Sequence, residues 1–221
     1  MKQTTANELA FFGKITAGFT HEIKNILAII KESSGLMEDL LALTKDDPFP
    51  HWDRFSHRLE VIRQQVQRGV ELTTRLNRFA HSPDEPVNRV DLNELADQLV
   101  RLSERFARLK EVTLKACFSD SQVTLVTSPV ELQMAVFALM EGCWNQMPAG
   151  NEIELRAELR EESPCILVRL TGNPESVAAT KYKVQSSDGF QATRELLQEL
   201  GGEILVDIQD GFALVFDDKK G

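Results

Sequence analysis

The sequence predicts an α+β protein in which a long helical hairpin is followed by an α/β sandwich. Two observations lead to this prediction. In the first 80 or so residues, apolar side chains recur every three and four positions, the period of long helices that pack side by side. After a polar, proline-containing stretch, the pattern changes to short alternating runs typical of strands, separated by shorter helical runs.

The first helix is predicted from Leu9 to Leu43. We call its row of regularly spaced apolar positions the seam, because such a row packs against other helices along its length. The seam consists of Phe12, Ile15, Phe19, Ile26, Ile29, Leu36, Leu40 and Leu43. The same register places two polar residues, Glu22 and Ser33, in it. Turn residues from Thr44 to Pro50 are expected to end the helix.

A second helix with a weaker seam is predicted to follow. Its positions are Phe55, Leu59, Ile62, Val66, Gly69, Thr73, Leu76 and Ala80. Two long helices joined by a short loop form an antiparallel hairpin. A lone hairpin cannot bury both of its apolar faces, so we expect two chains to associate as a homodimer with a four-helix bundle.

The polar segment His81–Pro86 contains two prolines and interrupts the helical period, so the domain boundary is placed there. Residues 1–82 form the predicted hairpin domain, and residues 83–221 form the second domain. Asp91 and Ser128 are expected to be N-caps of helices ending near Leu109 and Met147. The remaining predicted elements are strands at 112–118, 123–126, 153–159, 165–170, 204–208 and 212–216, and a helix at 194–200.

Composition and charge narrow the function classes. The chain has 221 residues and a net charge of −9, which argues against nucleic acid or an anionic membrane as the main partner. No apolar run is long enough to cross a bilayer and no signal segment is visible, so a cytoplasmic location is expected. Cys117, Cys143 and Cys165 form no ligand pattern, and we expect buried, reduced thiols.

The residue that points to chemistry is His21, which falls outside the seam, on the flank of the first helix. A histidine that accepts a phosphoryl group must present an unprotonated ring nitrogen. Glu22 can hold the imidazole tautomer or accept its proton. Asn25, one turn later on the same face, can orient a water or a phosphoryl oxygen, and Lys24 adds positive charge. A zinc-protease helix is excluded because it needs a second histidine at position 25.

The trio His21, Glu22 and Asn25 resembles the phosphoacceptor box of the two-component sensor histidine kinases, whose pattern is His-Glu-x-x-Asn or His-Glu-x-x-Thr. The C-terminal half resembles the ATP-binding domain of the same kinases in the order of its elements. The points of likeness are 90–95, 131–140, 147–150 and 200–204. The family's box usually continues with proline, and this chain has Ile26 there, so the helix is expected to run without the usual kink.

The residues that bind ATP in that family are missing at the corresponding positions. The asparagines of the central helix, one of which holds Mg²⁺, are replaced by Ala138 and Gly142, which offer no oxygen ligand. The adenine-reading aspartate and its glycines fall at a stretch beginning with Thr171. Of the glycine-rich phosphate loop only Gly189 survives, and Asp188 places a negative charge beside it. We therefore expect no ATP binding and no bound metal.

A phosphoacceptor hairpin followed by a kinase-like domain without an ATP site is similar to the dimeric histidine phosphotransferases of the sporulation and cell-cycle relays. The resemblance implies phosphoryl transfer through His21 between aspartates of response-regulator receiver domains. Those domains would supply their own Mg²⁺. His21 would be the nucleophile, Glu22 the proton acceptor or tautomer anchor, and Asn25 the orienting amide.

Three alternatives stay open at the level of sequence. The chain could be a divergent sensor kinase that still binds ATP. It could be a phosphatase of a phosphorylated regulator, with Asn25 orienting water. It could also be a non-catalytic dimeric scaffold, which would keep its binding activity after removal of the His21 ring.

Overall fold

The computed structural model describes residues 2–42, 52–84, 86–119, 121–206 and 210–217, with side chains for all of them except residues 2–6 and 84. By its internal contacts the chain divides into two units. Residues 13–81 form the hairpin unit, and residues 1–12 together with 82–221 form the second unit, which we call the sandwich unit.

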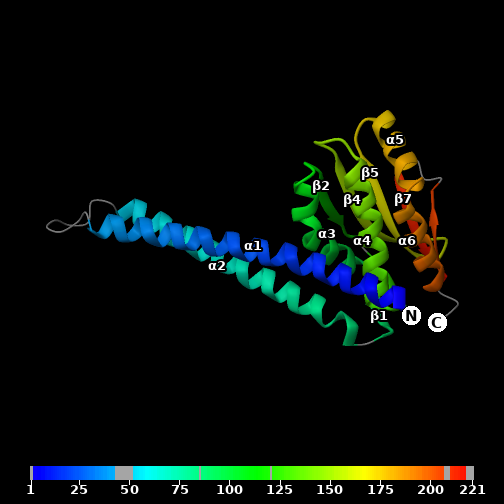
Figure 1. Cartoon of the computed structure of the whole chain (residues 1–221), viewed down its shortest axis with the longest axis horizontal. Helices are drawn as coiled ribbons and strands as arrows, with labels where there is room; N and C mark the ends of the chain where they lie inside the picture. The colour runs from blue at the N-terminus through cyan, green and yellow to red at the C-terminus, as the bar shows by residue number, and fades with distance from the viewer. Residues whose placement is uncertain (1, 43–51, 85, 120, 207–209, 218–221) are drawn as a thin grey trace. The chain divides into compact units, whose positions relative to one another are not determined.

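The hairpin unit is built from two long helices, seen in blue and cyan in Figure 1. Helix α1 runs from Lys2 to Ala42 and α2 from Trp52 to Ala80. The predicted seam of α1 is buried at Ile15, Phe19 and Ile26, and the polar seam position Ser33 is buried with them. The predicted turn from Thr44 to Pro50 lies outside the described residues.

Within one chain, the predicted seam of α2 is buried at only some of its positions. Leu59 and Val66 are exposed, whereas Ile62 and Leu76 are partly buried and Phe79, which the prediction omitted, is fully buried. The reason is that α2 carries apolar residues on more than one face, so a single periodic row cannot identify the face used within the chain.

The sandwich unit contains a five-stranded mixed sheet in the order β2-β4-β5-β7-β6. Its strands are β2 (Thr113–Cys117), β4 (Glu152–Arg160), β5 (Ser163–Thr171), β6 (Gly202–Leu205) and β7 (Gly211–Phe216). Strand β2 is parallel to β4, and the other pairs are antiparallel. A separate antiparallel pair joins β1 (Asn88–Asp91) to β3 (Thr124–Thr127).

Helices cover the sheet, as the sequence predicts for an α/β sandwich. They are α3 (Leu92–Arg108), α4 (Pro129–Gln146), α5 (Pro174–Gln185) and α6 (Asp188–Glu199), with a short 3₁₀ turn at Ser82–Asp84. Figure 1 shows α4 and α6 lying over the sheet. Alternate residues of β4 (Ile153, Leu155 and Ala157) are buried, which is the pattern of a strand with one face on the core.

Both predicted N-caps are confirmed. The Asp91 carboxylate accepts hydrogen bonds from the backbone N–H groups of Asn93 and Glu94, at 2.8 and 3.2 Å. The Ser128 hydroxyl accepts the N–H of Glu131 at 3.4 Å, and Pro129 follows at the first helical position. These bonds satisfy N–H groups that a helix start would otherwise leave without partners.

Helix α5 is an element that the sequence prediction missed, since it placed no helix or strand between residues 170 and 194. The local signal was present: the Asn173 side chain accepts the N–H of Glu175 at 3.0 Å, and Pro174 occupies the first turn. Strand β1 was also missed, because four residues are too few to display a clear alternation.

The start of α1 belongs by its contacts to the sandwich unit, although sequence alone assigns it to the hairpin domain. Phe11 is buried and packs edge-on against Phe137 of α4, with ring centroids 5.2 Å apart. Phe137 in turn contacts Trp144 and Phe106, at 5.6 and 6.1 Å. An aromatic cluster therefore ties the first turns of the chain to α4.

Candidate functional site

His21 lies on α1 with its side chain exposed to solvent. One turn later, the amide nitrogen of Asn25 lies 3.2 Å from Nδ1 of the His21 ring. The contact follows from helix geometry, since residues four apart lie one above the other on the same face. One ring nitrogen is thus engaged, and the other, Nε2, takes no part in this hydrogen bond.

Glu22 points away from this pair, toward α2. Consecutive residues on a helix differ in direction by about 100°, so the Glu22 side chain does not share a face with His21. Its carboxylate accepts a hydrogen bond from Nη2 of Arg68 at 2.9 Å, and its side chain is only 13% exposed. The role expected for Glu22 as tautomer anchor or proton acceptor stays a prediction, and the contact to Nδ1 is made by Asn25.

Arg68 is the residue that sequence analysis missed. It is separated from Glu22 by 46 positions, and no local pattern links the two. Pairing the two helices as an antiparallel hairpin in a fixed register would have placed them opposite each other. Lys24, the expected source of positive charge, is exposed on α1.

Two of the other histidines lie in the described ranges. His57 is exposed on α2, and His81 is exposed at the turn that follows α2. His51 lies outside the described residues. The residues four positions after His57 and His81 are Val61 and Glu85, so neither histidine repeats the spacing that places Asn25 one turn after His21.

The residues at the sequence-predicted nucleotide positions do not fit Mg²⁺ and ATP. On α4, a Cβ placed at Gly142 would meet Cγ1 of Val184 at 3.5 Å, so this face of the helix packs against α5. Val184 is itself buried. The position where a metal-binding side chain would have to project is therefore occupied by an apolar contact, and neither Gly142 nor Ala138 carries an oxygen donor.

The N-terminus of α6 is capped by side chains of the protein itself. The Ser187 hydroxyl accepts the N–H of Phe190 at 3.2 Å, and Asp188 adds a carboxylate to the first turn. A helix N-terminus attracts phosphate through free N–H groups and a positive partial charge, and both are reduced here. Gly189 lies within this first turn, and Thr171 ends β5 with its side chain exposed.

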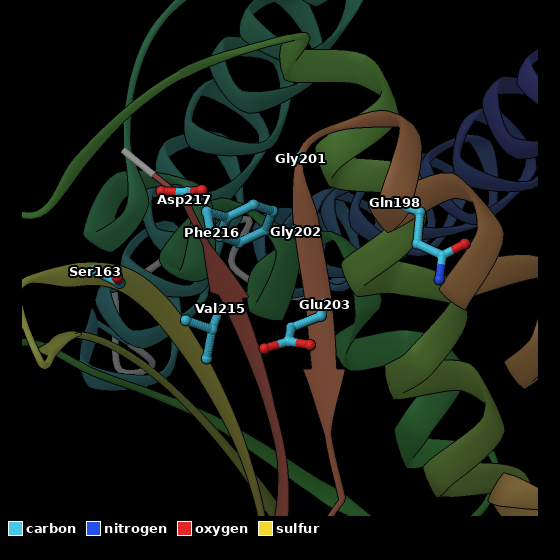
Figure 2. Close-up of a pocket in the computed structure, with 8 residues that line it drawn as sticks. All are labelled: Ser163, Gln198, Gly201, Gly202, Glu203, Val215, Phe216 and Asp217. Carbon is cyan, nitrogen blue, oxygen red and sulfur yellow. The ribbon is translucent and has the colours of Figure 1, made fainter. Parts of the chain in front are cut away.

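A cavity of about 480 Å³ lies elsewhere in the sandwich unit, where β6 and β7 meet the end of α6 (Figure 2). Its polar lining comes from Ser163, Gln198, Glu203 and Asp217, and none of its lining residues is basic. A lining with two carboxylates and no basic side chain disfavours a polyphosphate ligand. Gly142, Thr171 and Gly189 are not among the residues that line it.

The three cysteines behave largely as expected. Burial raises the pKa of the Cys143 thiol far above its ordinary value and that of Cys165 to about 12. Cys117 is only half-buried, and burial together with the nearby Glu154 raises its pKa too. Thiols that hold their protons are poor nucleophiles and poor metal ligands. Within the described ranges, no three His, Cys, Asp or Glu side chains gather as a metal site would require.

Comparison with known proteins gives likenesses of fold. No family model and no curated protein matches the chain. Solved structures that it resembles include cytoplasmic or catalytic parts of histidine kinases. The cytoplasmic segment of histidine kinase QseC is 14% identical, with a TM-score of 0.47, over 68% of this chain and 95% of that one.

Two further likenesses extend over nearly the whole chain. Histidine kinase AdeS of Acinetobacter baumannii is 12% identical, with a TM-score of 0.46, over 90% of this chain and 98% of that one. Histidine kinase ThkA, in a crystal structure with the response regulator protein TrrA, is 18% identical with a TM-score of 0.47. That likeness spans 96% of this chain and 64% of the other.

Within the described ranges, no helix combines the length and the apolar character that crossing a membrane requires.

Proposed function

We propose that this protein is a dimeric histidine phosphotransferase of a two-component phosphorelay. In this proposal His21 carries a phosphoryl group between aspartates of response-regulator receiver domains. The observation that carries the proposal is the exposed His21 ring whose Nδ1 is engaged by Asn25. A phosphoacceptor histidine needs such a fixed orientation and one accessible nitrogen.

The hydrogen bond decides which nitrogen attacks. A neutral imidazole has one N–H and one lone pair, and an amide offers either an N–H donor or a carbonyl acceptor. With the Asn25 amide rotated so that its Oδ1 accepts the Nδ1–H, the lone pair lies on Nε2. With its nitrogen facing Nδ1, as the contact stands, the neutral ring carries its proton on Nε2. The nucleophilic form is thus the one with the carbonyl oxygen toward the ring.

The phosphoryl-transfer step requires no chemical group from the sandwich unit. The Nε2 lone pair attacks the phosphorus of an aspartyl phosphate in line with the bond to be broken. The Nε2–P bond forms while the P–O bond to the aspartate breaks, and the carboxylate leaves with the electron pair. The reverse step returns the phosphoryl group to a second aspartate. Mg²⁺ would be supplied by the receiver domain, where it neutralises phosphoryl oxygens.

The sandwich unit is assigned a role other than ATP binding. The packing of Gly142 against Val184, the capped start of α6 at Ser187 and the acidic cavity lining support this part of the proposal. A metal or a nucleotide would have to displace the first two contacts, and the acidic lining disfavours polyphosphate in the cavity. The divergent-kinase alternative would need a nucleotide site made from other residues.

Homodimerisation is supported by the apolar residues that the hairpin leaves exposed. Large apolar side chains on both helices are in contact with solvent: Leu27, Leu36, Leu41, Trp52, Leu59, Val66 and Val70. Exposed apolar residues along one hairpin provide a surface that can pack against a second hairpin. A four-helix bundle formed by two chains would cover them.

The decisive experiment uses a receiver domain that has been phosphorylated with acetyl phosphate and freed of the donor. We expect the wild-type protein to remove the phosphoryl group from the receiver domain and to become labelled with acid-labile phosphate itself. His21→Gln should abolish the gain, while His57→Gln, which alters another exposed histidine, should leave it unchanged. Loss of receiver phosphate without label on the protein would indicate a phosphatase instead. Receiver binding that persists in His21→Gln with no transfer by either protein would indicate a scaffold.

The divergent-kinase alternative is tested by titrating Mg²⁺ and ATP into the protein in a calorimeter and then adding radiolabelled ATP. We expect neither heat of binding nor incorporated label. Binding followed by label on His21 would overturn the phosphotransferase proposal and identify a working kinase.

A further inference from the structure

Strand β6 forms one edge of the sheet, beside the cavity at the end of α6. Among the described strands, its single neighbour is β7. An edge strand keeps a row of backbone N–H and C=O groups with which another extended chain can pair. The β6 edge is therefore a place where a further strand can be added to the sheet.

The alternation of hydrogen bonds along β6 identifies the backbone groups that face outward. The N–H of Asp217 donates to the carbonyl of Gly201 at 3.2 Å, so these two residues form a hydrogen-bonded pair. Such pairs alternate with non-hydrogen-bonded pairs along an antiparallel ladder. Gly202 and Ile204 are thus the residues whose N–H and C=O groups point away from β7. Within the described ranges, neither residue makes a backbone hydrogen bond outside the sheet.

The side chains that reach this edge are of two kinds. Directly paired residues place their side chains on the same face of a sheet. Two rows of paired residues end at β6 on one face: Cys165, Val215 and Glu203, and Leu167, Ala213 and Leu205. The second row is apolar throughout and belongs to a buried cluster. The first row is apolar as far as Glu203, whose side chain is exposed.

The row that ends at Glu203 borders the cavity of about 480 Å³. Figure 2 shows the Glu203 and Val215 side chains projecting from neighbouring strands, and both line the cavity with Asp217 and Ser163. The lining holds two carboxylates and no basic side chain. Among the described residues, Glu203 has no ion-pair partner. The charge of the cavity therefore favours a cation.

We propose that the β6 edge binds an extended basic segment of a partner protein, which adds to the sheet as a strand. The backbone groups of Gly202 and Ile204 would hold the segment, as in other cases of strand addition. The residue opposite Glu203 is arginine or lysine, with its charged end in the cavity and its apolar stem against Val215.

Two positions along the segment, the residue opposite Leu205 is apolar, because it extends a row of buried apolar side chains. The segment thus carries a basic residue and an apolar residue separated by one position. None of the residues at this edge takes part in transfer at His21, so the site is independent of the proposed function.

The probe is the fluorescently labelled peptide TVTRTVT with blocked ends, whose binding to the full chain is measured by anisotropy. In an extended peptide the arginine and the valines share one face, and the pattern is the same in both chain directions. We expect saturable binding. Citrulline, which keeps the shape of arginine without its charge, should weaken binding about fivefold. Threonine at both valine positions should weaken it roughly tenfold. No binding of TVTRTVT would overturn the proposal.

Glu203→Gln tests the predicted partner of the arginine. This variant should lower the preference for arginine over citrulline to about twofold, since one carboxylate of the lining remains. The matched control is Glu104→Gln, which alters an exposed carboxylate of α3 that does not line the cavity, and it should leave the preference unchanged. Equal preferences in wild type and Glu203→Gln would refute the assignment.

Strand addition is tested through the peptide backbone. In a strand, alternate N–H groups face the neighbouring strand, so a methyl group on the nitrogen blocks pairing at every second residue. One peptide is methylated at the arginine nitrogen and another at the nitrogens of the two adjacent threonines. One of the two should lose binding and the other should keep it. Binding by both would exclude strand addition.

Two other occupants of the edge are distinguished by variants. Lys219 and Lys220 follow Asp217 closely in the sequence and provide cations of the chain itself. Replacing both by glutamine should leave peptide affinity unchanged, and tighter binding would assign the cavity to these lysines instead of a partner. Glu203→Gln should also leave the mass measured by light scattering unchanged. A change in mass would assign the edge to a second copy of this chain and overturn the proposal.

Discussion

Replacing Phe11 by alanine tests whether the first turns of α1 are a structural part of the sandwich unit. The Phe11 side chain is only 7% exposed, and its ring meets Phe137 edge-on at 5.2 Å and 62°. Phe137 is itself packed against Trp144 at 5.6 Å. Truncation at residue 11 therefore opens a cavity beside the aromatic cluster on α4.

The cost can be worked from these contacts. Truncating a buried phenylalanine to alanine typically costs about 3–5 kcal/mol, including the cavity left behind. The edge-on ring pair contributes about 1 kcal/mol of such a loss. Phe11 lies near the start of a helix, where the chain can partly collapse into the space, so the lower part of the range applies. We expect the free energy of unfolding of the sandwich unit to fall by about 3 kcal/mol.

The chain's two tryptophans provide the assay. Trp144 is 2% exposed within the cluster, whereas Trp52 on α2 is 62% exposed. In a Trp52→Phe background, fluorescence reports only the surroundings of Trp144. With a urea dependence of roughly 2 kcal/mol per molar, a loss of about 3 kcal/mol should lower the unfolding midpoint by about 1.5 M.

Leu9→Ala is the matched control, since Leu9 is an apolar residue of the same helix and is 69% exposed. Its effect should stay within about 0.5 kcal/mol. If Phe11→Ala moves the Trp144 transition no further than Leu9→Ala does, the first turns of α1 do not stabilise the sandwich unit. The reasoning from the aromatic contacts would then be refuted.

Three further predictions concern the site and the core. Asn25→Ala should slow phosphoryl transfer through His21 roughly tenfold or more in the receiver assay, because the ring loses its orienting hydrogen bond; an unchanged rate would remove Asn25 from the mechanism. Gly142→Ala should stabilise the protein to urea by about 0.5–1 kcal/mol, since the added methyl finds ordinary contact with Val184 and alanine favours helix; destabilisation would show that the packing is tighter than this. Burial raises the pKa of the Cys165 thiol to about 12, so the folded state holds this proton more tightly than the unfolded state. The associated stability is present below about pH 9 and is lost as the pH rises toward 12. Cys165→Ala should therefore lose about 1 kcal/mol less than wild type between pH 8 and pH 10, and equal losses would contradict the pKa argument.

Much of the architecture can be predicted from patterns among residues that are close together in the sequence. The period of the apolar residues predicts the two long helices, and the oxygen-bearing side chains of Asp91 and Ser128 predict where α3 and α4 begin. These features depend on residues within one or two turns, so they can be inferred from sequence. Asn173 and Pro174 carried the same kind of signal for α5, although the sequence prediction placed no element there.

Other features depend on which surfaces meet. The face that α2 uses within the chain could not be chosen from its period, because Leu59 and Val66 fit the pattern as well as Ile62 does. Likewise, periodicity extends the hairpin through Phe11, whereas the contact with Phe137 assigns those turns to the sandwich unit. Burial against a distant element is decided by packing, which no local pattern records.

For the candidate site, the sequence alone determined an exposed histidine on a helix with an amide one turn later, because spacing on a helix fixes the direction of side chains. It also determined that Ala138 and Gly142 carry no oxygen donors in their side chains. Only the tertiary structure decided that Glu22 binds Arg68 rather than the ring, and that Val184 packs against Gly142. Both contacts join residues more than 40 positions apart. They exist because the packing of apolar faces brings two helices together, and that packing depends on the whole chain.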